Sequence, residues 1–266
     1  LSHYIFIRYV ETYFPELRLI GNLAELPLLS SYQFAQDPFT AKTNLQAAFV
    51  YRRNLAQPLL TPTQDLTKYN RKIALRSRSA MGIKILEETE SKEKIDAFIL
   101  NLFTSKQNLN PLTIQEHFEL FFEDRAKWFY EGYCTDNRLT DYEIRQIGKL
   151  ANQVHIEMTN HTNAQNPIKL NSYSKHQLVS SVWLPGGAVE QRLSFDQTKI
   201  DKIVLNPDQL VLEVNTNNNN IILNNSFTKR DRRFRLFEDI PSSHYVTTYV
   251  APNLIYNAYD GVLMGI

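Results

Sequence analysis

The sequence predicts an α+β fold, in which a mainly helical N-terminal half is followed by an antiparallel β-rich C-terminal half. Two observations lead to this prediction. Residues 61–158 carry apolar side chains at helical spacing behind several helix-start signals. From residue 168 onward, short β-type runs recur at intervals of roughly 8 to 12 residues, as in a meander, sandwich or partial barrel. Because the polar segment 160–167 separates these patterns, we expect a helical domain with a few short strands over 1–160 and a β-rich domain over 168–266.

The first sixty residues are expected to hold short elements. His3–Val10 is rich in β-forming residues and fits either a buried strand or the start of a helix. Prolines recur through residues 11–43, which favours short elements joined by loops. The apolar run Leu45–Tyr51 predicts a strand.

A helix is predicted to begin at Thr61–Gln64, where an N-cap threonine is followed by proline at the first helical position. Gly82 is a suitable end for this helix, and Ile83–Leu86 then predicts a short strand. Ser91 opens a second helix, whose apolar residues form one stripe.

Two capping boxes predict a third and a fourth helix. Thr113-x-x-Glu116 precedes a phenylalanine-rich stripe. Thr140-x-x-Glu143 precedes apolar residues at spacings of three and four that continue to Met158.

The β-rich half is organised around a predicted hairpin over residues 199–215. Asn206-Pro207-Asp208 is a turn signal, because proline presets φ and the flanking side chains bond to their own backbone. Branched apolar runs flank this turn on both sides. The remaining strands are expected over residues 178–184, 188–195, 221–227, 233–240, 245–250 and 254–259.

The composition argues against several classes of protein. The 29 basic and 28 acidic residues nearly cancel, so no global charge attracts the chain to nucleic acid or to membranes. Only 8 glycines are present, and neither phosphate-binding glycine motif occurs, which disfavours a nucleotide-cofactor enzyme. The lone Cys134 shows no sign of activation, and no signal peptide or membrane-spanning run is visible. We therefore expect a cytoplasmic protein, although the sequence begins at Leu1.

The predicted hairpin carries two acids, Asp201 and Glu213, on its two strands. This arrangement resembles the metal-dependent nucleases of the PD-(D/E)xK kind, in which such carboxylates hold a divalent cation that polarises a phosphate. The resemblance implies that Asp201 and Glu213 are catalytic metal ligands and that Mg²⁺ is the cofactor. The lysine of the motif is replaced by Asn215. The alternative is a surface hairpin whose acids face solvent.

Two clusters of positive charge suggest a nucleic-acid interface. The residues expected to contact phosphate are Lys68, Arg71, Lys72, Arg76, Arg78, Arg230, Arg232, Arg233 and Arg235. The second cluster is interleaved with Phe234 and Phe237, which suits base stacking. The alternative is a pair of solvated faces.

Three functions follow from these patterns. The first is nucleic-acid binding, with metal-dependent nuclease activity if the two acids converge. The second is a non-enzymatic structural or assembly subunit that docks on a protein partner or another copy through its β-rich half, with Trp128 or Trp183 as an anchor or a core residue. The third is an enzyme acting on a small substrate in a pocket between the two halves.

Overall fold

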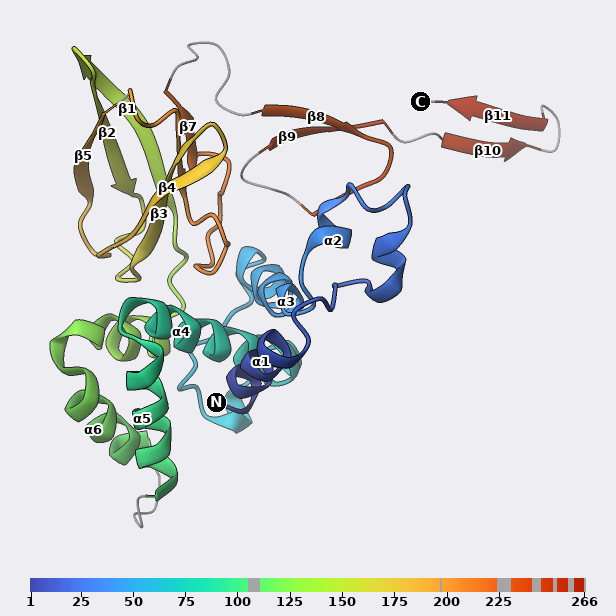
Figure 1. Cartoon of the computed structure of the whole chain (residues 1–266). Helices are drawn as coiled ribbons and strands as arrows, with labels where there is room; N and C mark the ends of the chain where they lie inside the picture. The colour runs from blue at the N-terminus through green and yellow to red at the C-terminus, as the bar shows by residue number, and fades with distance from the viewer. Residues whose placement is uncertain are drawn as a thin grey trace.

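Helix α4 (Leu75–Thr89) is the central element of the helical half. It contacts α1 (Ser2–Tyr13), α3 (Ala41–Arg52), α5 (Lys92–Thr104) and the π-helical segment η5 (Trp128–Cys134). The other helical elements are η1 (Gly21–Glu25), α2 (Gln33–Gln36), η2 (Thr63–Asp65), η3 (Asn70–Ala74), α6 (Pro111–Phe122) and η4 (Glu123–Ala126). Figure 1 shows α5 and α6 extending as an antiparallel pair from the end of α4.

The computed structural model describes residues 1–104, 111–196, 198–223, 231–240, 245–250, 253–257 and 261–265. Within these ranges, side chains are described except for residues 111–113, 231 and those from 253 onward. Among the described residues, every helix falls short of the length and apolarity that a membrane span requires.

Two antiparallel sheets make up the body of the β-rich half. One has the strand order β1-β2-β5 and the other has the order β4-β3-β6-β7. Their strands are β1 (Tyr142–Leu150), β2 (Gln153–Asn160), β3 (Ile168–Ser174), β4 (Gln177–Leu184), β5 (Glu190–Asp196), β6 (Lys202–Leu205) and β7 (Asn220–Ile222). The α+β class is therefore confirmed, with helices first and antiparallel sheets second.

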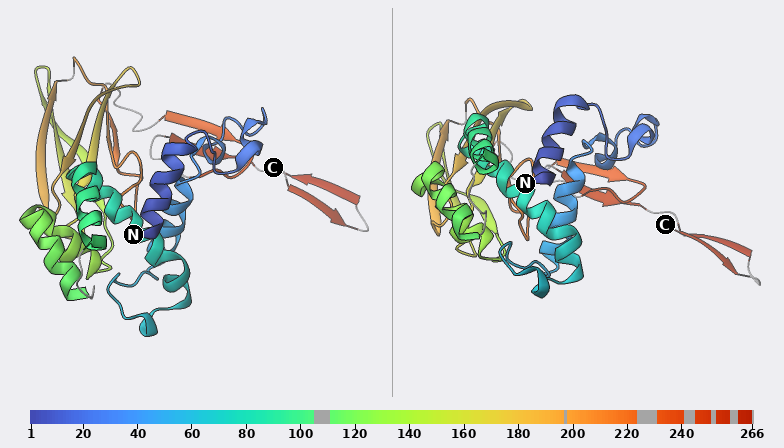
Figure 2. Two further views of the ribbon diagram at one scale, coloured as in Figure 1. Left: turned by 60° about the horizontal axis from the view of Figure 1, so that its bottom comes forward. Right: turned by 90° about the horizontal axis from the view of Figure 1, so that it is seen from below.

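Two further strand pairs lie beyond these sheets. β8 (Asp231–Arg235) pairs with β9 (Tyr245–Tyr249), and this pair is parallel. β10 (Asn253–Asn257) and β11 (Gly261–Gly265) form an antiparallel pair that projects from the body in both views of Figure 2. The segment of η1 and α2 lies beside β8–β9 in Figures 1 and 2.

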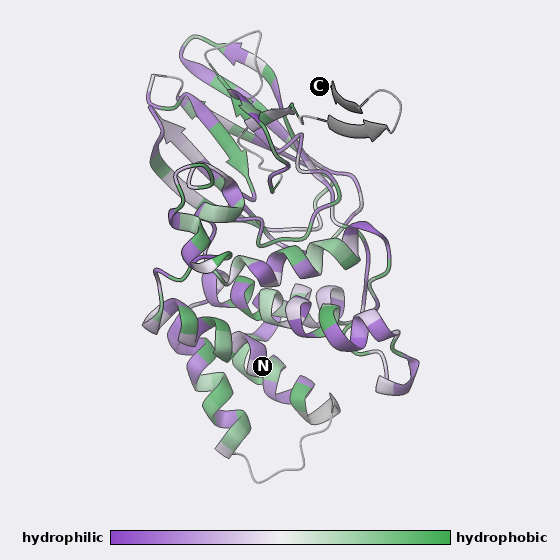
Figure 3. Cartoon of the chain, turned by 90° about the vertical axis from the view of Figure 1, so that its right-hand side faces the viewer, coloured by the Kyte–Doolittle hydropathy of each residue, from purple (hydrophilic) through white to green (hydrophobic). Residues whose placement is uncertain are grey.

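One hydrophobic core joins the helical half to both main sheets. Ile85 of α4 belongs to the same buried cluster as Ile156 of β2 and Leu170 of β3. A second cluster lies within the helical half and includes Phe118 and Phe122 of α6 together with Tyr4 of α1. Apolar and polar residues alternate along the helices in Figure 3, as expected where each helix buries only one face.

The predicted helix over 140–158 is wrong, because this segment forms β1 and β2. Ile144, Val154 and Met158 satisfy the helical spacing, but they also fit the spacing of two that a half-buried strand requires. The turn between the two strands places Ala151 at a φ of 51°. The change from helices to strands consequently falls between Cys134 and Tyr142.

Two predicted strands of the helical half are also wrong. Leu45–Tyr51 lies in α3 and Ile83–Leu86 lies in α4. Helix α4 continues through Gly82 because this glycine serves packing: a Cβ there would lie 2.6 Å from the Tyr133 ring. The helix predicted to begin at Ser91 is confirmed, and the Ser91 hydroxyl accepts a hydrogen bond from the Lys94 amide at 3.2 Å.

The predicted hairpin over 199–215 is wrong as well. Strand β6 pairs with β3 and β7, and residues 210–213 form no strand beside it. The turn itself is present, since the Asn206 side chain donates to the Val211 carbonyl at 2.6 Å and accepts from the Val211 amide at 3.1 Å. After this turn, Glu213 forms an isolated parallel β-bridge with Thr140.

Candidate functional site

Glu213 lies in the interior rather than in an open metal site. Its side chain comes from the segment after the Asn206 turn, and the residue is only 2% exposed. Glu213 Oε2 accepts hydrogen bonds from the amides of Asn206 at 2.7 Å and Asn219 at 2.6 Å. Oε1 accepts from the Tyr142 backbone amide at 3.2 Å. Burial raises the pKa of this carboxyl to about 7, although the three donors act in the opposite direction.

Asp201 lies at the other end of β6. Its carboxylate accepts a hydrogen bond from the Lys175 backbone amide at 2.7 Å, in the turn between β3 and β4. Asn206, which contacts Glu213, is five residues further on, or about 16 Å along an extended strand. The structure therefore does not bring Asp201 and Glu213 together. Among the residues with described side chains, no group of three or more His, Cys, Asp or Glu is placed to hold a metal ion.

The first cationic cluster remains open to solvent over most of its length. Lys68 just before η3, Arg71 and Lys72 in η3, and Arg76 at the start of α4 are all exposed. Within the described residues none of them has a carboxylate partner, and Arg71 donates only to the backbone carbonyls of Thr63 and Leu66.

The fifth member of that cluster, Arg78, is buried with 3% exposure. Its guanidinium donates to the Gln57 carbonyl at 2.6 Å and to the Asp136 carbonyl at 3.4 Å. It also lies over the Tyr133 ring, 5.5 Å from the ring centre. Arg78 therefore does not share the surface of the other four residues.

Two members of the second cluster, Arg233 and Arg235, are engaged in internal contacts. Asp239 accepts from Arg233 at 3.1 Å and lies 3.9 Å from Arg235. Arg235 also donates to the Ser31 carbonyl at 2.6 Å, which ties β8 to the segment before α2. Arg232 is exposed. Arg230 lies outside the described residues, and in Figures 1 and 2 strand β8 and the segment preceding α4 lie at different ends of the helical half.

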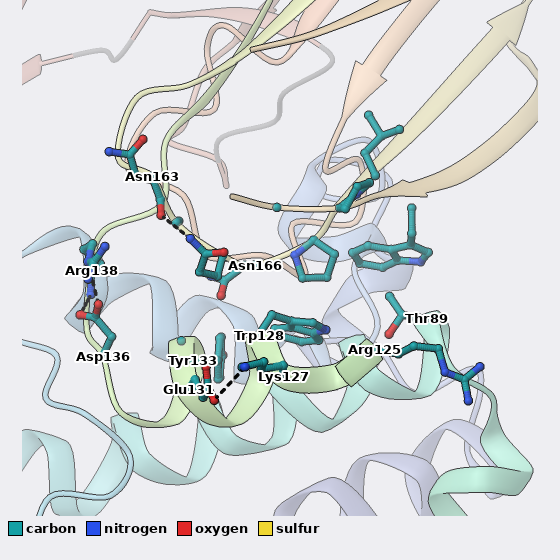
Figure 4. Close-up of a pocket in the computed structure, with 18 of the residues that line it drawn as sticks. Thr89, Arg125, Lys127, Trp128, Glu131, Tyr133, Asp136, Arg138, Asn163 and Asn166 are labelled. Carbon is teal, nitrogen blue, oxygen red and sulfur yellow. Dashed lines mark hydrogen bonds and ion pairs between the residues drawn. The ribbon is translucent and has the colours of Figure 1, made fainter. Parts of the chain in front are cut away.

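A cleft of about 700 Å³ separates η5 from the loops and strands of the β-rich half. Figure 4 shows Trp128 of η5 on one side of it, with the preceding Lys127 directed along η5 toward Glu131, and Asn163 and Asn166 on the facing loop. Trp183 of β4 lines the same cleft. The Gly186-Gly187 turn is required here, because a Cβ on Gly186 would collide with the backbone of Gln165. A pocket between the two halves is one of the expectations from the sequence, but the residues that line it are not predicted, since its walls come from segments far apart in the chain.

The rim charges of the cleft are paired with one another. Lys127 lies 3.6 Å from Glu131, and Arg138 lies 2.7 Å from Asp136. Cys134 is buried nearby, and this burial raises the pKa of its thiol to about 12, so the thiol is not activated as a nucleophile.

The pair β8–β9 presents an apolar surface, which we call the β8–β9 face. It consists of Phe234 and Val246, on the side of the pair away from Asp239, together with Leu236, Phe237 and Val250 just beyond the two strands. Tyr245 and Tyr249 are also exposed, but they lie on the side of Arg233 and Asp239. The most exposed is Phe234, at 70%. On a strand with one face in water, charged side chains are expected on the water side and apolar side chains on the protein side. On β8 the opposite holds for three residues: Arg233 and Arg235 point inward to Asp239, and Phe234 faces outward.

Comparisons with known proteins give little further guidance. No known family matches the chain, and no curated protein matches it. Among solved structures, it is similar to Legionella pneumophila aminopeptidase A in complex with aspartic acid, at 12% identity and a TM-score of 0.45. That match covers 53% of this chain and 17% of the aminopeptidase chain.

Proposed function

We propose that this chain is a structural or assembly subunit that docks on another copy of itself through the β8–β9 face. The observation that carries the proposal is the reversed pattern of β8. A strand that faced only water would place its arginines outward and its phenylalanine inward. Here Arg233 and Arg235 are used internally, and Phe234 faces outward beside the exposed Arg232, where a partner could cover it.

The edges of β8–β9 support the same function. Each strand pairs with one neighbour among the described residues, so each leaves an outer edge without a strand partner. Such edges are templates for a further strand unless charge, proline or a covering element blocks them. An exposed apolar face next to an open edge is typical of an interaction site.

The β8–β9 face is also held in place. Asp239 accepts hydrogen bonds from the backbone amides of Gln33 at 2.9 Å and Phe34 at 3.2 Å. The Tyr32 hydroxyl accepts from the Leu236 amide at 3.2 Å. A surface fixed to the helical half in this way loses less conformational entropy when a partner binds.

The experiment compares Phe234→Asp with Leu120→Asp, which alters another apolar side chain, 76% exposed on α6. Sedimentation velocity over a micromolar concentration series should show association of the unmodified chain, weakened only by Phe234→Asp. Binding of the fluorescent dye bis-ANS, which reports contiguous apolar surface, should fall in the same variant. Unchanged sedimentation and unchanged dye binding in Phe234→Asp would contradict the proposal.

A second candidate function is nucleic-acid binding confined to Lys68, Arg71, Lys72 and Arg76. The observation that favours it is the lack of any carboxylate partner for these four residues in the part of the chain that the structure describes. Tyr69, 55% exposed, lies among them and offers a ring for base stacking. The salt dependence that tests this candidate is given in the Discussion.

A further inference from the structure

The cleft between η5 and the β-rich half contains one buried charge that the protein itself does not neutralise. Arg78 lines the cleft and has no carboxylate partner among the described residues. Its Nε is buried without a hydrogen-bond acceptor. A guanidinium keeps its charge under all ordinary conditions, and burying it without a counter-ion is costly. The carbonyls of Gln57 and Asp136 satisfy the two Nη atoms but carry no net negative charge.

The other cations of the cleft do not share this property. Arg125 lies 3.9 Å from Glu90, and the pairs Lys127–Glu131 and Arg138–Asp136 neutralise the rest of the rim. The one lining acid without a cation partner within the described residues is Asp124, which is exposed and can keep its water shell. Among the described cations that line the cleft, Arg78 is therefore the one that lacks a negatively charged partner.

The walls of the cleft add a second requirement. Trp128 comes from the helical half and Trp183 from β4, and both side chains are only partly buried. Indole rings bind flat groups by stacking, and the volume of about 700 Å³ lies within the range of small-molecule sites. The amides of Asn163 and Gln165 on the facing loop supply neutral hydrogen-bonding groups.

We propose that this cleft binds a small organic anion, composed of a flat ring and one carboxylate or phosphate group. The anionic group faces Arg78, and the ring lies against the tryptophans. This site is separate from the β8–β9 face, so the proposal does not depend on the docking function.

The chain provides a direct reporter of binding, because its 2 tryptophans are Trp128 and Trp183. Intrinsic tryptophan fluorescence therefore arises from the walls of the cleft alone. The probes are benzoate and phenyl phosphate, with benzamide as the uncharged analogue of benzoate and inorganic phosphate as the anion without a ring. Trp128→Phe and Trp183→Phe each leave one reporter on one wall.

We expect a saturable change in fluorescence with benzoate or phenyl phosphate, seen in both single-tryptophan variants. Benzamide should bind at least about tenfold more weakly, which corresponds to about 1.4 kcal/mol. Benzoate binding without phenyl phosphate binding identifies the anion as a carboxylate, and the reverse identifies it as a phosphate. Equal affinity for benzamide and benzoate, or quenching that never saturates, would overturn the proposal.

Arg78→Gln should abolish the preference for benzoate over benzamide. The control is Arg76→Gln, two residues earlier on the same helix and exposed, which should bind as the unmodified chain does. If Arg78→Gln fails to fold, the comparison of charged with uncharged probes on the unmodified chain still decides the question.

Discussion

The side-chain amide of Asn219 donates a hydrogen bond of 2.6 Å to Oε2 of Glu213, a carboxyl that is almost completely buried. Asn206 donates a hydrogen bond to the same oxygen, and it precedes Glu213 in the chain whereas Asn219 follows it. Glu213 thereby links the turn after β6 to the start of β7 and, through the Tyr142 amide, to the start of β1. This acid, predicted as a metal ligand, thus has an observed role in joining three segments of the β-rich half.

Stability should depend on pH through Glu213. Burial raises its pKa from 4.5 to about 7, so between these values the folded chain binds more protons than the unfolded chain. The free energy of unfolding should therefore fall as pH rises from 4.5 to about 7 and change no further above it. The loss should be about 3 kcal/mol at most. Urea unfolding at several pH values measures it.

Glu213→Gln is the matched control for this prediction. Glutamine cannot titrate, so the fall between the two pKa values should disappear. The glutamine NH₂ group is itself a donor, and it must face one of the amides that donate to the carboxyl group in the unmodified chain. The variant should therefore also be less stable by about 2 kcal/mol at low pH. A pH profile that is the same in the variant and in the unmodified chain would assign the dependence to other groups.

Gly82→Ala should destabilise the chain by about 2 kcal/mol, because the new methyl group overpacks a buried contact. Its Cβ would lie 2.6 Å from the Tyr133 ring and 2.8 Å from the Phe129 ring. The Tyr133 ring cannot easily move, since its hydroxyl donates to the Arg78 carbonyl at 2.9 Å. Thermal unfolding measures the effect. Gly148→Ala, where nothing lies within 4 Å of the added Cβ, should show little change.

Asp239→Asn should loosen the contact between β8 and the α2 segment. The substitution leaves Arg233 and Arg235 without their shared carboxylate, and unpaired, largely buried arginines cost about 3 kcal/mol. Hydrogen exchange followed by mass spectrometry should show faster exchange in residues 31–36 and 231–240, with α4 and α5 unaffected. The control is the neighbouring exposed acid, Glu238→Gln. Equal exchange in the two variants would show that Asp239 does not hold this contact.

Nucleic-acid binding through Lys68, Arg71, Lys72 and Arg76 predicts a defined salt dependence. Four phosphate contacts on duplex DNA give a slope of log K against log salt of about −3.6, measured between about 50 and 200 mM salt. The double variant Lys68→Gln, Lys72→Gln should reduce the slope by about 1.8. Arg232→Gln should leave it unchanged. Absence of binding at the lowest salt, or a slope that the double variant does not alter, would exclude this function.

The sequence predicts the order of the fold well, because capping and periodicity are local properties. The helix from Ser91 and the strands β4, β5 and β9 follow from such signals, whereas β3 and the true partners of β6 do not. Local signals fail over 140–158, where Val154 and Met158, four residues apart, satisfy both helical and strand spacing. Pairing in the sheet decides between them, since β2 receives hydrogen bonds from β1 on one side and β5 on the other.

The candidate sites depend on contacts between distant residues, and these leave little trace in the sequence. The clustering of Arg233 and Arg235 can be read from the sequence. Their shared ion pair cannot, because it depends on the position of Asp239, whose carboxylate contacts both arginines and the Gln33 backbone amide. Likewise, the charge of Arg78 is visible in the sequence, whereas its burial against Tyr133 depends on η5 packing on α4.

The hydrogen bond between Gln33 and Asp239 spans 206 positions of the chain. During synthesis on the ribosome, the α2 segment emerges early and must wait for nearly all of the remaining described residues before this contact can form. Long-range closures of this kind slow folding. Until then Tyr32, which is buried in the folded chain, lacks its contacts with Leu236 and Phe237, so it is at this stage that we expect the nascent chain to need a chaperone.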